Sequence, residues 1–406
     1  MGTILRNSAF LFVGEGIRLL SIFLVLVAAA RELGAFGYGQ FSYAYALAGI
    51  LGILATLGFP DVLVREIVQR REERLFSTLL LLQIGFGVLV LGVLGGAAAL
   101  FLWGEDSVVA KSLLLLLVFF LAQAGIFSVG AFFRARQRME QEAMVRGGGA
   151  LLLLALGLAV LKFSPGVQQL AAAYAAAGIL AVAGTLLVFH VRVCALRFHM
   201  DWPTWKEFLL LSWPVGITVV LGSVLGSVDS VMLGLFGQVQ EVGWYNAGYR
   251  IASLAAVPAA LVGASFFPVL SRGALLARGF LRPVFFRYLG AMVVLGVPVS
   301  AAGMALAPVV IDALYGQGFA PAAPALQLLF GAVLMQFFYL PFFFLLLAAN
   351  RVHALLVVVG VATAGNILLN AFLIPPFSLY GAAAASAVSY AFMAGATGLV
   401  SFRKVL

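Results

Sequence analysis

The chain has 406 residues, of which 64% are hydrophobic and only 10% charged, and its mean hydropathy is +1.13. A soluble domain averages about 45–50% apolar and about 25% charged residues, so this composition excludes a soluble enzyme. The formal net charge of +9 is explained by basic loops around membrane spans. No loop shows the pattern of a nucleic-acid-binding module, and nucleic acid is not expected as a partner.

Hydropathy along the chain predicts twelve spanning helices, each near the length of about 20 residues that a bilayer requires. They are residues 8–30, 41–60, 76–103, 111–133, 147–163, 169–191, 208–236, 246–270, 285–311, 325–349, 352–374 and 380–400. Apolar runs such as Leu113–Phe120 do not alternate polar and apolar residues, as strands of a membrane barrel would. The predicted fold class is therefore all-α, a polytopic membrane protein.

The first span has an alternative interpretation as a cleavable signal peptide that ends at the alanines 28–30. Its apolar part is about 20 residues long, whereas a signal-peptide core has about 7–15. It also contains Glu15 and Arg18, which a cleaved signal does not need. We therefore expect it to be retained as the first membrane helix.

Lys and Arg are distributed unevenly between the two sides of the predicted spans. The loops on one side contain 19 of them and the loops on the other side contain 4, while Arg18 lies inside the first span. Because cytoplasmic loops are the basic ones, both termini are expected on the cytoplasmic side of the cytoplasmic (inner) membrane. Membrane lipids, including anionic head groups near the basic loops, are expected partners.

A weak internal repeat divides the chain into halves. Residues 39–45 (GQFSYAY) and 243–249 (GWYNAGY) are 204 positions apart and each opens the second helix of a half. This predicts two six-helix bundles, residues 1–195 and 196–406, with the charged connection near 192–207 as linker. Prolines are concentrated in the spans of the second half, where we favour static kinks over bending during transport.

The sequence gives no sign of a metal site or another cofactor. Cys194 is the only cysteine, and the three histidines are not spaced as metal ligands. The sequence contains no Walker A motif, so ATP hydrolysis by a P-loop is not expected.

Ionisable residues at membrane depth are expensive and usually face a cavity or a partner. Arg18 lies near the middle of the first span, and Glu15 is one turn away on the same face. They form either a self-neutralising pair or a substrate site, in which Arg18 binds an anionic group and Glu15 takes up a proton or cation. The two interpretations are compatible, because substrate can compete with Glu15 for Arg18.

Asp229 and Arg250 flank a short predicted loop in the second half. They are expected to form a structural ion pair or an outer gate, and Asp229 is also a candidate for ion coupling. Neutral polar residues suit a path for sugars, although each is individually more typical of interhelical hydrogen bonding. These residues are Gln83, Gln123, Asn246, Gln336, Asn366 and Asn370, together with Tyr43, Tyr45, Tyr245 and Tyr249.

Three segments resemble the polysaccharide-transporter (Wzx-type oligosaccharide flippase) family, within the multidrug, oligosaccharidyl-lipid and polysaccharide exporter superfamily. They are residues 4–66 (ILRNSAFLFVGEGIRLLS through TLGFPDVLVRE), 227–251 (SVDSVMLGLFGQVQEVGWYNAGYRI) and 365–390 (GNILLNAFLIPPFSLYGAAAASAVSY). The resemblance implies two bundles around a central cavity and export of a lipid-linked oligosaccharide on a polyprenyl phosphate or diphosphate. It also implies a cationic cavity residue facing the phosphate, which Arg18 matches by position, and glycan polymerisation or ligation machinery as a further partner.

Two other functions remain as alternatives. A multidrug antiporter of the same superfamily would expel organic cations, but a midplane arginine favours an anion. A membrane-bound polysaccharide polymerase or ligase would need a large outer loop with catalytic polar residues. The longest predicted outer loop, about residues 312–324, has Asp312 as its sole charge, so we predict a transporter and no enzyme.

Overall fold

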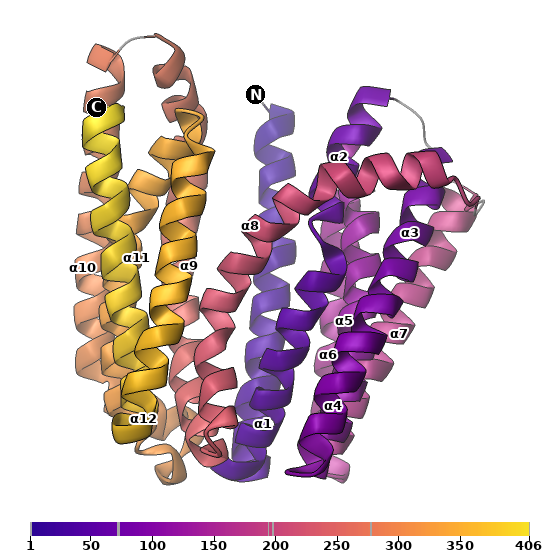
Figure 1. The fold of residues 1–406 in the computed structure, drawn as a ribbon, viewed down its shortest axis with the longest axis vertical. Helices are drawn as coiled ribbons and strands as arrows, with labels where there is room; N and C mark the ends of the chain where they lie inside the picture. Colours follow the sequence, from indigo (N-terminus) through magenta and orange to yellow (C-terminus); the bar gives the residue numbers. More distant parts are fainter. Residues whose placement is uncertain (1, 71–73, 194, 197–198, 277, 406) are drawn as a thin grey trace. The chain divides into compact units, whose positions relative to one another are not determined.

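The computed structural model describes residues 2–70, 74–193, 195–196, 199–276 and 278–405, which are almost entirely helical and form no β-strand. In chain order the elements (Figure 1) are α1 (Gly2–Thr56), α2 (Phe59–Arg70), α3 (Arg74–Val90), the π-helix η1 (Leu91–Gly95), α4 (Gly96–Trp103), α5 (Ser107–Ala135), α6 (Met139–Phe163), α7 (Val167–Arg192), α8 (Trp202–Leu235), α9 (Val239–Leu276), α10 (Arg278–Tyr315), the 3₁₀ helix η2 (Gln317–Phe319), α11 (Ala322–Ala348) and α12 (Val352–Lys404). The predicted all-α membrane class is confirmed.

Within these ranges, ten helical stretches are long and apolar enough to cross a membrane. Two of them, Val13–Val68 and Val352–Arg403, each cover all or most of two predicted spans. The backbone is interrupted at Gly34 in α1 (φ 68°) and at Ser378 in α12 (φ 52°), and each interruption lies between those two spans. Such a left-handed backbone conformation cannot continue an α-helix. The predicted number of twelve spans stays a prediction.

The described residues form two compact units, Met1–Ser223 (unit 1) and Val224–Leu406 (unit 2). The boundary between these units lies within α8, and the division into six-helix bundles between residues 195 and 196 stays a prediction. The beginning of α8 belongs to unit 1 because its aromatic side chains pack there. Trp205 Nε1 donates to the Thr78 carbonyl oxygen at 3.1 Å, and the ring centroid of Phe208 lies 5.3 Å from that of Phe59.

Unit 1 is built around α5, the most enclosed of its candidate spans. Asp106 begins this helix by accepting hydrogen bonds from the backbone N–H groups of Val108 and Val109, and Gln40 Nε2 donates to the same carboxylate at 2.6 Å. Glycines allow α5 and α7 to approach closely. A Cβ at Gly125 would lie 2.9 Å from the Val182 side chain, as expected where small residues line helix contacts in lipid.

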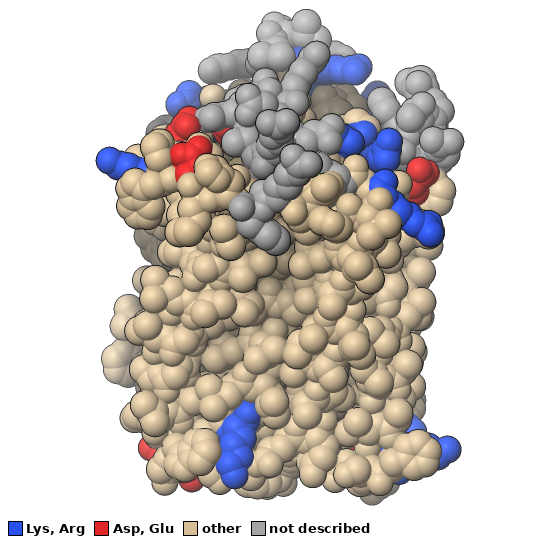
Figure 2. All heavy atoms as spheres, turned by 90° about the vertical axis from the view of Figure 1, so that its right-hand side faces the viewer, with Lys and Arg blue, Asp and Glu red and all other residues tan. Residues whose placement is uncertain are grey.

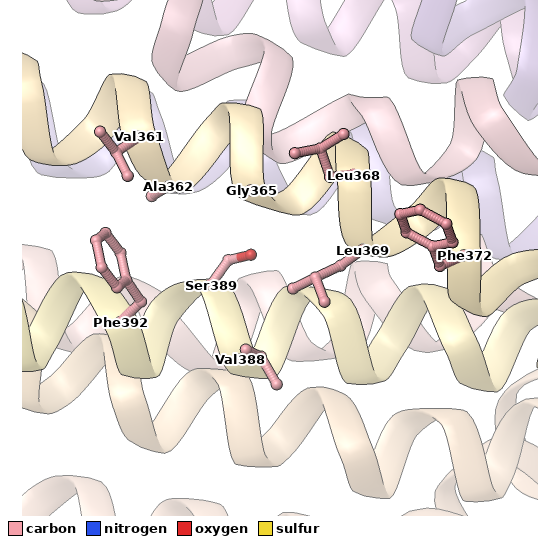
Figure 3. A pocket seen from close by; sticks show the side chains of 9 residues that line it. All are labelled: Val361, Ala362, Gly365, Leu368, Leu369, Phe372, Val388, Ser389 and Phe392. Atoms are coloured by element: carbon pink, nitrogen blue, oxygen red, sulfur yellow. The ribbon is translucent and has the colours of Figure 1, made fainter.

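Unit 2 packs aromatic side chains of α11 into glycine positions of its neighbours. Phe337, which is 1% exposed, lies over Gly296 of α10, where a Cβ would be 2.5 Å from the ring. The two segments of α12 enclose an apolar groove of about 430 Å³, and Phe372 and Phe392 lie toward its opposite ends (Figure 3). The lining hydroxyl of Ser389 donates to Ala385 O within its own helix, so the groove offers mainly apolar contact.

The exposed surface has the distribution of charge expected for a membrane protein. On the face shown in Figure 2, charged side chains lie at the two ends and a broad uncharged region separates them. Large apolar side chains are exposed on the helices, such as Leu100 and Phe101 of α4. A soluble protein would bury much of this surface, whereas a bilayer solvates it.

Candidate functional site

The predicted pair of Glu15 and Arg18 is present in unit 1. Arg18 lies midway between Gly2 and the interruption at Gly34. Arg18 Nε donates to Glu15 Oε2 at 3.0 Å and Nη2 donates to Oε1 at 2.5 Å. The two side chains keep 29% and 42% of their surface exposed. Each can therefore still contact another group beyond its partner.

Helix α1 brings this pair next to a second group of charges on α6. A Cβ at Gly14 would lie 2.8 Å from Ala143, and a Cβ at Gly147 would lie 3.8 Å from the Ile17 side chain. The contacting residues of each helix are next in sequence to its charged residues. The Glu15–Arg18 pair and the residues Glu142 and Arg146 therefore lie on adjacent turns of contacting helices.

The hairpin between α5 and α6 positions the second group of charges. Arg134 is in the last turn of α5 and Glu142 in the first turn of α6, as the helix dipoles favour. Between the helices, Gln137 has a left-handed backbone conformation (φ 58°) that reverses the chain. Opposite Glu142, Gly130 has no side chain, and a Cβ there would come within 3.3 Å of Glu142 Cγ. The local sequence therefore makes room for a buried carboxylate.

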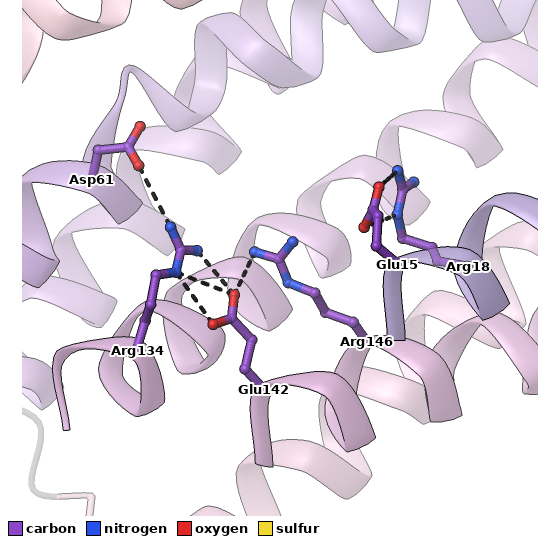
Figure 4. A network of polar contacts seen from close by, with 6 residues as sticks. All are labelled: Glu15, Arg18, Asp61, Arg134, Glu142 and Arg146. Atoms are coloured by element: carbon purple, nitrogen blue, oxygen red, sulfur yellow. Dashed lines mark hydrogen bonds and ion pairs between the residues drawn. The ribbon is translucent and has the colours of Figure 1, made fainter. Parts of the chain in front are cut away.

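Glu142 is 1% exposed and pairs with two arginines. Arg134 Nη2 donates to Glu142 Oε1 at 3.0 Å, and Arg146 Nη2 lies 2.8 Å from the same oxygen. Asp61 of α2 is held more loosely, because its Oδ1 is 3.9 Å from Arg134 Nη1 and its side chain is 59% exposed. We call Glu15, Arg18, Asp61, Arg134, Glu142 and Arg146 the charge cluster of unit 1 (Figure 4).

Part of the charge cluster lines a cavity of about 390 Å³, which we call the unit 1 cavity. Its lining includes Asp61, Arg134 and Arg146, the neutral polar residues Thr56 and Gln123, and the aromatic residues Phe120 and Phe127. The Arg146 guanidinium lies 5.0 Å from the Phe127 ring centroid, a cation–π contact. The cavity can thus offer cationic, hydrogen-bonding and aromatic contacts to one ligand.

Of these lining residues, only Gln123 was predicted from the sequence to lie on a transport path. Arg134 and Arg146 were assigned to loops, because the predicted spans ended at 133 and began again at 147. In the structure α5 continues to Ala135 and α6 begins at Met139, so both arginines are helical. A signal was available, since Glu142 and Arg146 are four residues apart and would share one face of a helix.

Unit 2 contains a buried polar cluster around Asp229 of α8, which is 3% exposed. Tyr245 Oη and Ser386 Oγ each donate to Asp229 Oδ2 at 2.5 Å, and Asn370 Nδ2 donates to Oδ1 at 2.6 Å. Asn370 Nδ2 also donates to Asn366 Oδ1 at 3.1 Å. This Asp229 cluster joins α8, α9 and both segments of α12. The pairing of Asp229 with Arg250 stays a prediction.

The other predicted site residues are divided between the units. Tyr45 lies in unit 1, where its ring contacts Phe120 and Tyr174. In unit 2, Asn246 Nδ2 donates to Ser230 Oγ and to Val242 O, both at 2.9 Å, which is a structural link between α8 and α9. The remaining three are Tyr249, which stacks on Tyr245, and the half-buried Arg250 and Gln336.

Within the described ranges, no group of three or more His, Cys, Asp or Glu residues could hold a metal ion.

Known proteins are similar to this chain in sequence and in fold. The chain is 23% identical over 411 aligned residues to the probable low-salt glycan biosynthesis flippase Agl15 of Haloferax volcanii, covering 95% of this chain and 81% of that protein. Its fold is similar to an inward-facing multidrug resistance MATE family transporter of the MOP superfamily, with a TM-score of 0.79 at 14% identity over 97% of this chain and 98% of the other. It is also similar to the lipid II flippase MurJ in an inward closed conformation, with a TM-score of 0.76 at 13% identity over 98% and 87% of the two chains.

The structural likenesses show the fold alone, because their sequence identities are low. The family is shown by sequence, since residues 4–274 match the model of a family described as polysaccharide biosynthesis protein. That match covers well over half of the chain and agrees with the resemblance found in the sequence. The chain therefore belongs to the polysaccharide biosynthesis protein family, and its fold is similar to that of a MOP superfamily transporter.

Proposed function

We propose that the protein is a flippase that moves a lipid-linked oligosaccharide, on a polyprenyl phosphate or diphosphate, across the cytoplasmic membrane by alternating access. The family and the glycan biosynthesis flippase from Haloferax volcanii support a role in glycan export. The observation that carries the proposal is the charge cluster of unit 1, with its polar and aromatic cavity inside an otherwise apolar bundle. An anionic carrier with a sugar head group matches that chemistry.

The physical difficulty of this transport lies in the head group. Moving a sugar through hydrocarbon strips its hydroxyls of hydrogen bonds, each at several kcal/mol. Thr56, Gln123 and the arginines of the unit 1 cavity can replace water for part of the head group. The prenyl chain needs no such replacement, because hydrocarbon already solvates it.

The direction of transport follows from the predicted orientation. With both termini cytoplasmic, the α5–α6 hairpin that bears Arg134 lies on the cytoplasmic side, where we expect the cargo to enter. Outward transport would deliver the oligosaccharide to polymerisation or ligation machinery, which we propose as downstream partners.

We further propose that an ion gradient drives transport through Asp229. Asp229 is 3% exposed, and its hydrogen-bond donors Tyr245, Ser386 and Asn370 are neutral side chains. Because a buried carboxylate is costly without a compensating positive charge, this site suits a cation or a proton. Glu15, the other candidate carboxylate, is already bound by Arg18 through two hydrogen bonds.

The coupling site is tested in ion-loaded vesicles. Asp229→Asn is expected to abolish gradient-dependent transport. Glu15→Gln also removes one carboxylate and is the variant for comparison. Wild-type transport rates in both variants would reject coupling through either residue.

The function itself is tested by deleting the gene and analysing surface glycan and lipid-linked intermediates. We expect loss of the surface glycan and accumulation of the lipid-linked oligosaccharide, restored by the wild-type gene. Intact surface glycan with raised sensitivity to cationic dyes would instead support the multidrug antiporter.

A further inference from the structure

We propose that the unit 1 cavity binds the phosphoryl group of the carrier, with Arg134 and Arg146 as phosphate ligands and Asp61 as the carboxylate that the phosphate displaces. The ligand class is a phosphate or diphosphate ester with a sugar attached. This inference rests on the proposed function, because it assigns one part of the proposed cargo to one cavity.

The two arginines have hydrogen-bonding capacity beyond their contacts with Glu142. A guanidinium has five N–H donors in a planar fork that matches phosphate. Both arginines direct an Nη2 group to the same oxygen, Glu142 Oε1. Both arginines also line the cavity and keep part of their side chains exposed, 31% for Arg134 and 21% for Arg146. The structure therefore fixes the two guanidinium groups on one buried carboxylate and leaves donors for another anion.

The charges indicate which carboxylate that anion replaces. Glu142 is buried and contacts both arginines at 2.8–3.0 Å, so it is their fixed counterion. Asp61 is 59% exposed and its oxygen is 3.9 Å from Arg134, so its attraction is weakened by solvent. It lies on α2, just beyond Leu57 and Gly58, two consecutive residues with positive φ. When Asp61 moves away, two guanidinium groups face one carboxylate and a phosphate can bind in its place.

The remaining lining of the unit 1 cavity suits the first sugar. Thr56 and Gln123 offer hydrogen bonds, and Phe120 and Phe127 offer the aromatic faces on which sugar rings commonly pack. The volume of about 390 Å³ is within the range of about 300–1,000 Å³ usual for small-ligand pockets. The cavity is thus large enough for a phosphoryl group and the sugar next to it.

The binding experiment uses the full chain in nanodiscs of phosphatidylcholine and farnesyl diphosphate as the probe, with calorimetry as the measurement. Arg134→Gln and Arg146→Gln are each expected to weaken binding about 10- to 100-fold, as loss of a charged hydrogen bond does. Asp61→Asn is expected to tighten binding about two- to five-fold, because it removes a weak competitor.

Two variants on the same hairpin are matched controls. Arg138→Gln and Glu140→Gln make the same changes of charge at exposed positions outside the cavity lining, and should alter the affinity less than two-fold. Equal changes of affinity in the controls would show that the net charge of the protein, and not this site, determines binding. Unchanged or weaker binding in Asp61→Asn would also overturn the proposal. Asp61→Asn changes only an exposed side chain, so this test stands even where an arginine variant fails to fold.

Inorganic pyrophosphate and farnesol identify the source of the phosphoryl group. Arginine-dependent binding that is tighter for farnesyl diphosphate than for pyrophosphate assigns the site to a lipid-linked phosphate, and equal affinities assign it to the phosphate alone. Either result supports the cavity as a phosphoryl site. Farnesol binding as tightly as farnesyl diphosphate would reject it.

The binding result is independent of the proposed transport. Wild-type affinity in both arginine variants, together with loss of surface glycan on gene deletion, would reject the site and keep the flippase. Arginine-dependent binding in a protein whose deletion leaves the glycan intact would reject the flippase and keep the site.

Discussion

Removing both arginines around Glu142 should destabilise unit 1 far more than removing either one. In Arg134→Met or Arg146→Met, the remaining arginine still compensates the buried carboxylate at 2.8–3.0 Å. Glu142, which is 1% exposed, loses both of these ion pairs in the double variant. Leaving a buried charge uncompensated costs about 3–5 kcal/mol, so we expect the double variant to lose about that much stability.

Removing the carboxylate as well should restore the stability that the double variant loses. Apolar residues of similar volume often replace a buried ion pair without loss of stability. Adding Glu142→Met to the double variant should therefore restore most of the stability, although the triple variant no longer holds any of the three charges.

Thermal unfolding in detergent, followed by tryptophan fluorescence, measures both effects. For a domain of 150–250 residues, 1 kcal/mol corresponds to about 2–4 °C in Tm, so the double variant should melt about 6–20 °C lower. Arg138→Met, on the exposed part of the same hairpin, is the control and should leave Tm within about 2 °C. A double variant that melts with the single variants, or a triple variant that melts lower still, would refute this account of Glu142.

Three further predictions concern packing, capping and bending. Gly216→Ala should lower Tm, because its Cβ would lie 2.8 Å from the Leu57 backbone, whereas Gly222→Ala on the same helix has open space and should be neutral or stabilising. Asp106→Ala should destabilise unit 1 by about 0.5–2 kcal/mol through loss of the α5 cap, measured as a fall in Tm. Pro298→Ala should leave the vesicle transport rate unchanged if the proline only shapes α10; a changed rate would assign bending to that helix.

Contacts within one helix were predictable from the sequence, and contacts between distant helices were not. Glu15 and Arg18 are three residues apart, so helical periodicity alone places them on one face. Asp229 and Asn366 were both recognised as polar residues at membrane depth, but nothing in their spacing indicates that they join one cluster through Asn370. That contact depends on how α12 packs on α8, which hydropathy does not specify.

The arginines of the unit 1 cavity were missed for a different reason. A hydropathy profile ends a span where charge begins, so Arg134 and Arg146 themselves set the predicted boundaries at 133 and 147. The backbone does not end there, because arginine is a good helix former and Glu142 compensates both charges inside the bundle. Charged residues that pair across a hairpin therefore resemble loop residues in a sequence profile, although they extend the helices.

The two units differ in the charge of their polar clusters, and this difference links the proposals. In unit 1, Arg134 and Arg146 line the cavity and keep part of their side chains exposed, which suits an anion. In unit 2, the buried carboxylate of Asp229 accepts hydrogen bonds from the neutral side chains of Tyr245, Ser386 and Asn370, which suits a cation or proton. A transporter that exchanges an anionic cargo against a cation gradient needs both kinds of site. Reversing the charge preference of the two sites would remove the coupling. A variant of Asp229 should therefore alter gradient dependence without altering diphosphate affinity, and a variant of Arg146 should weaken diphosphate binding with the Asp229 cluster intact.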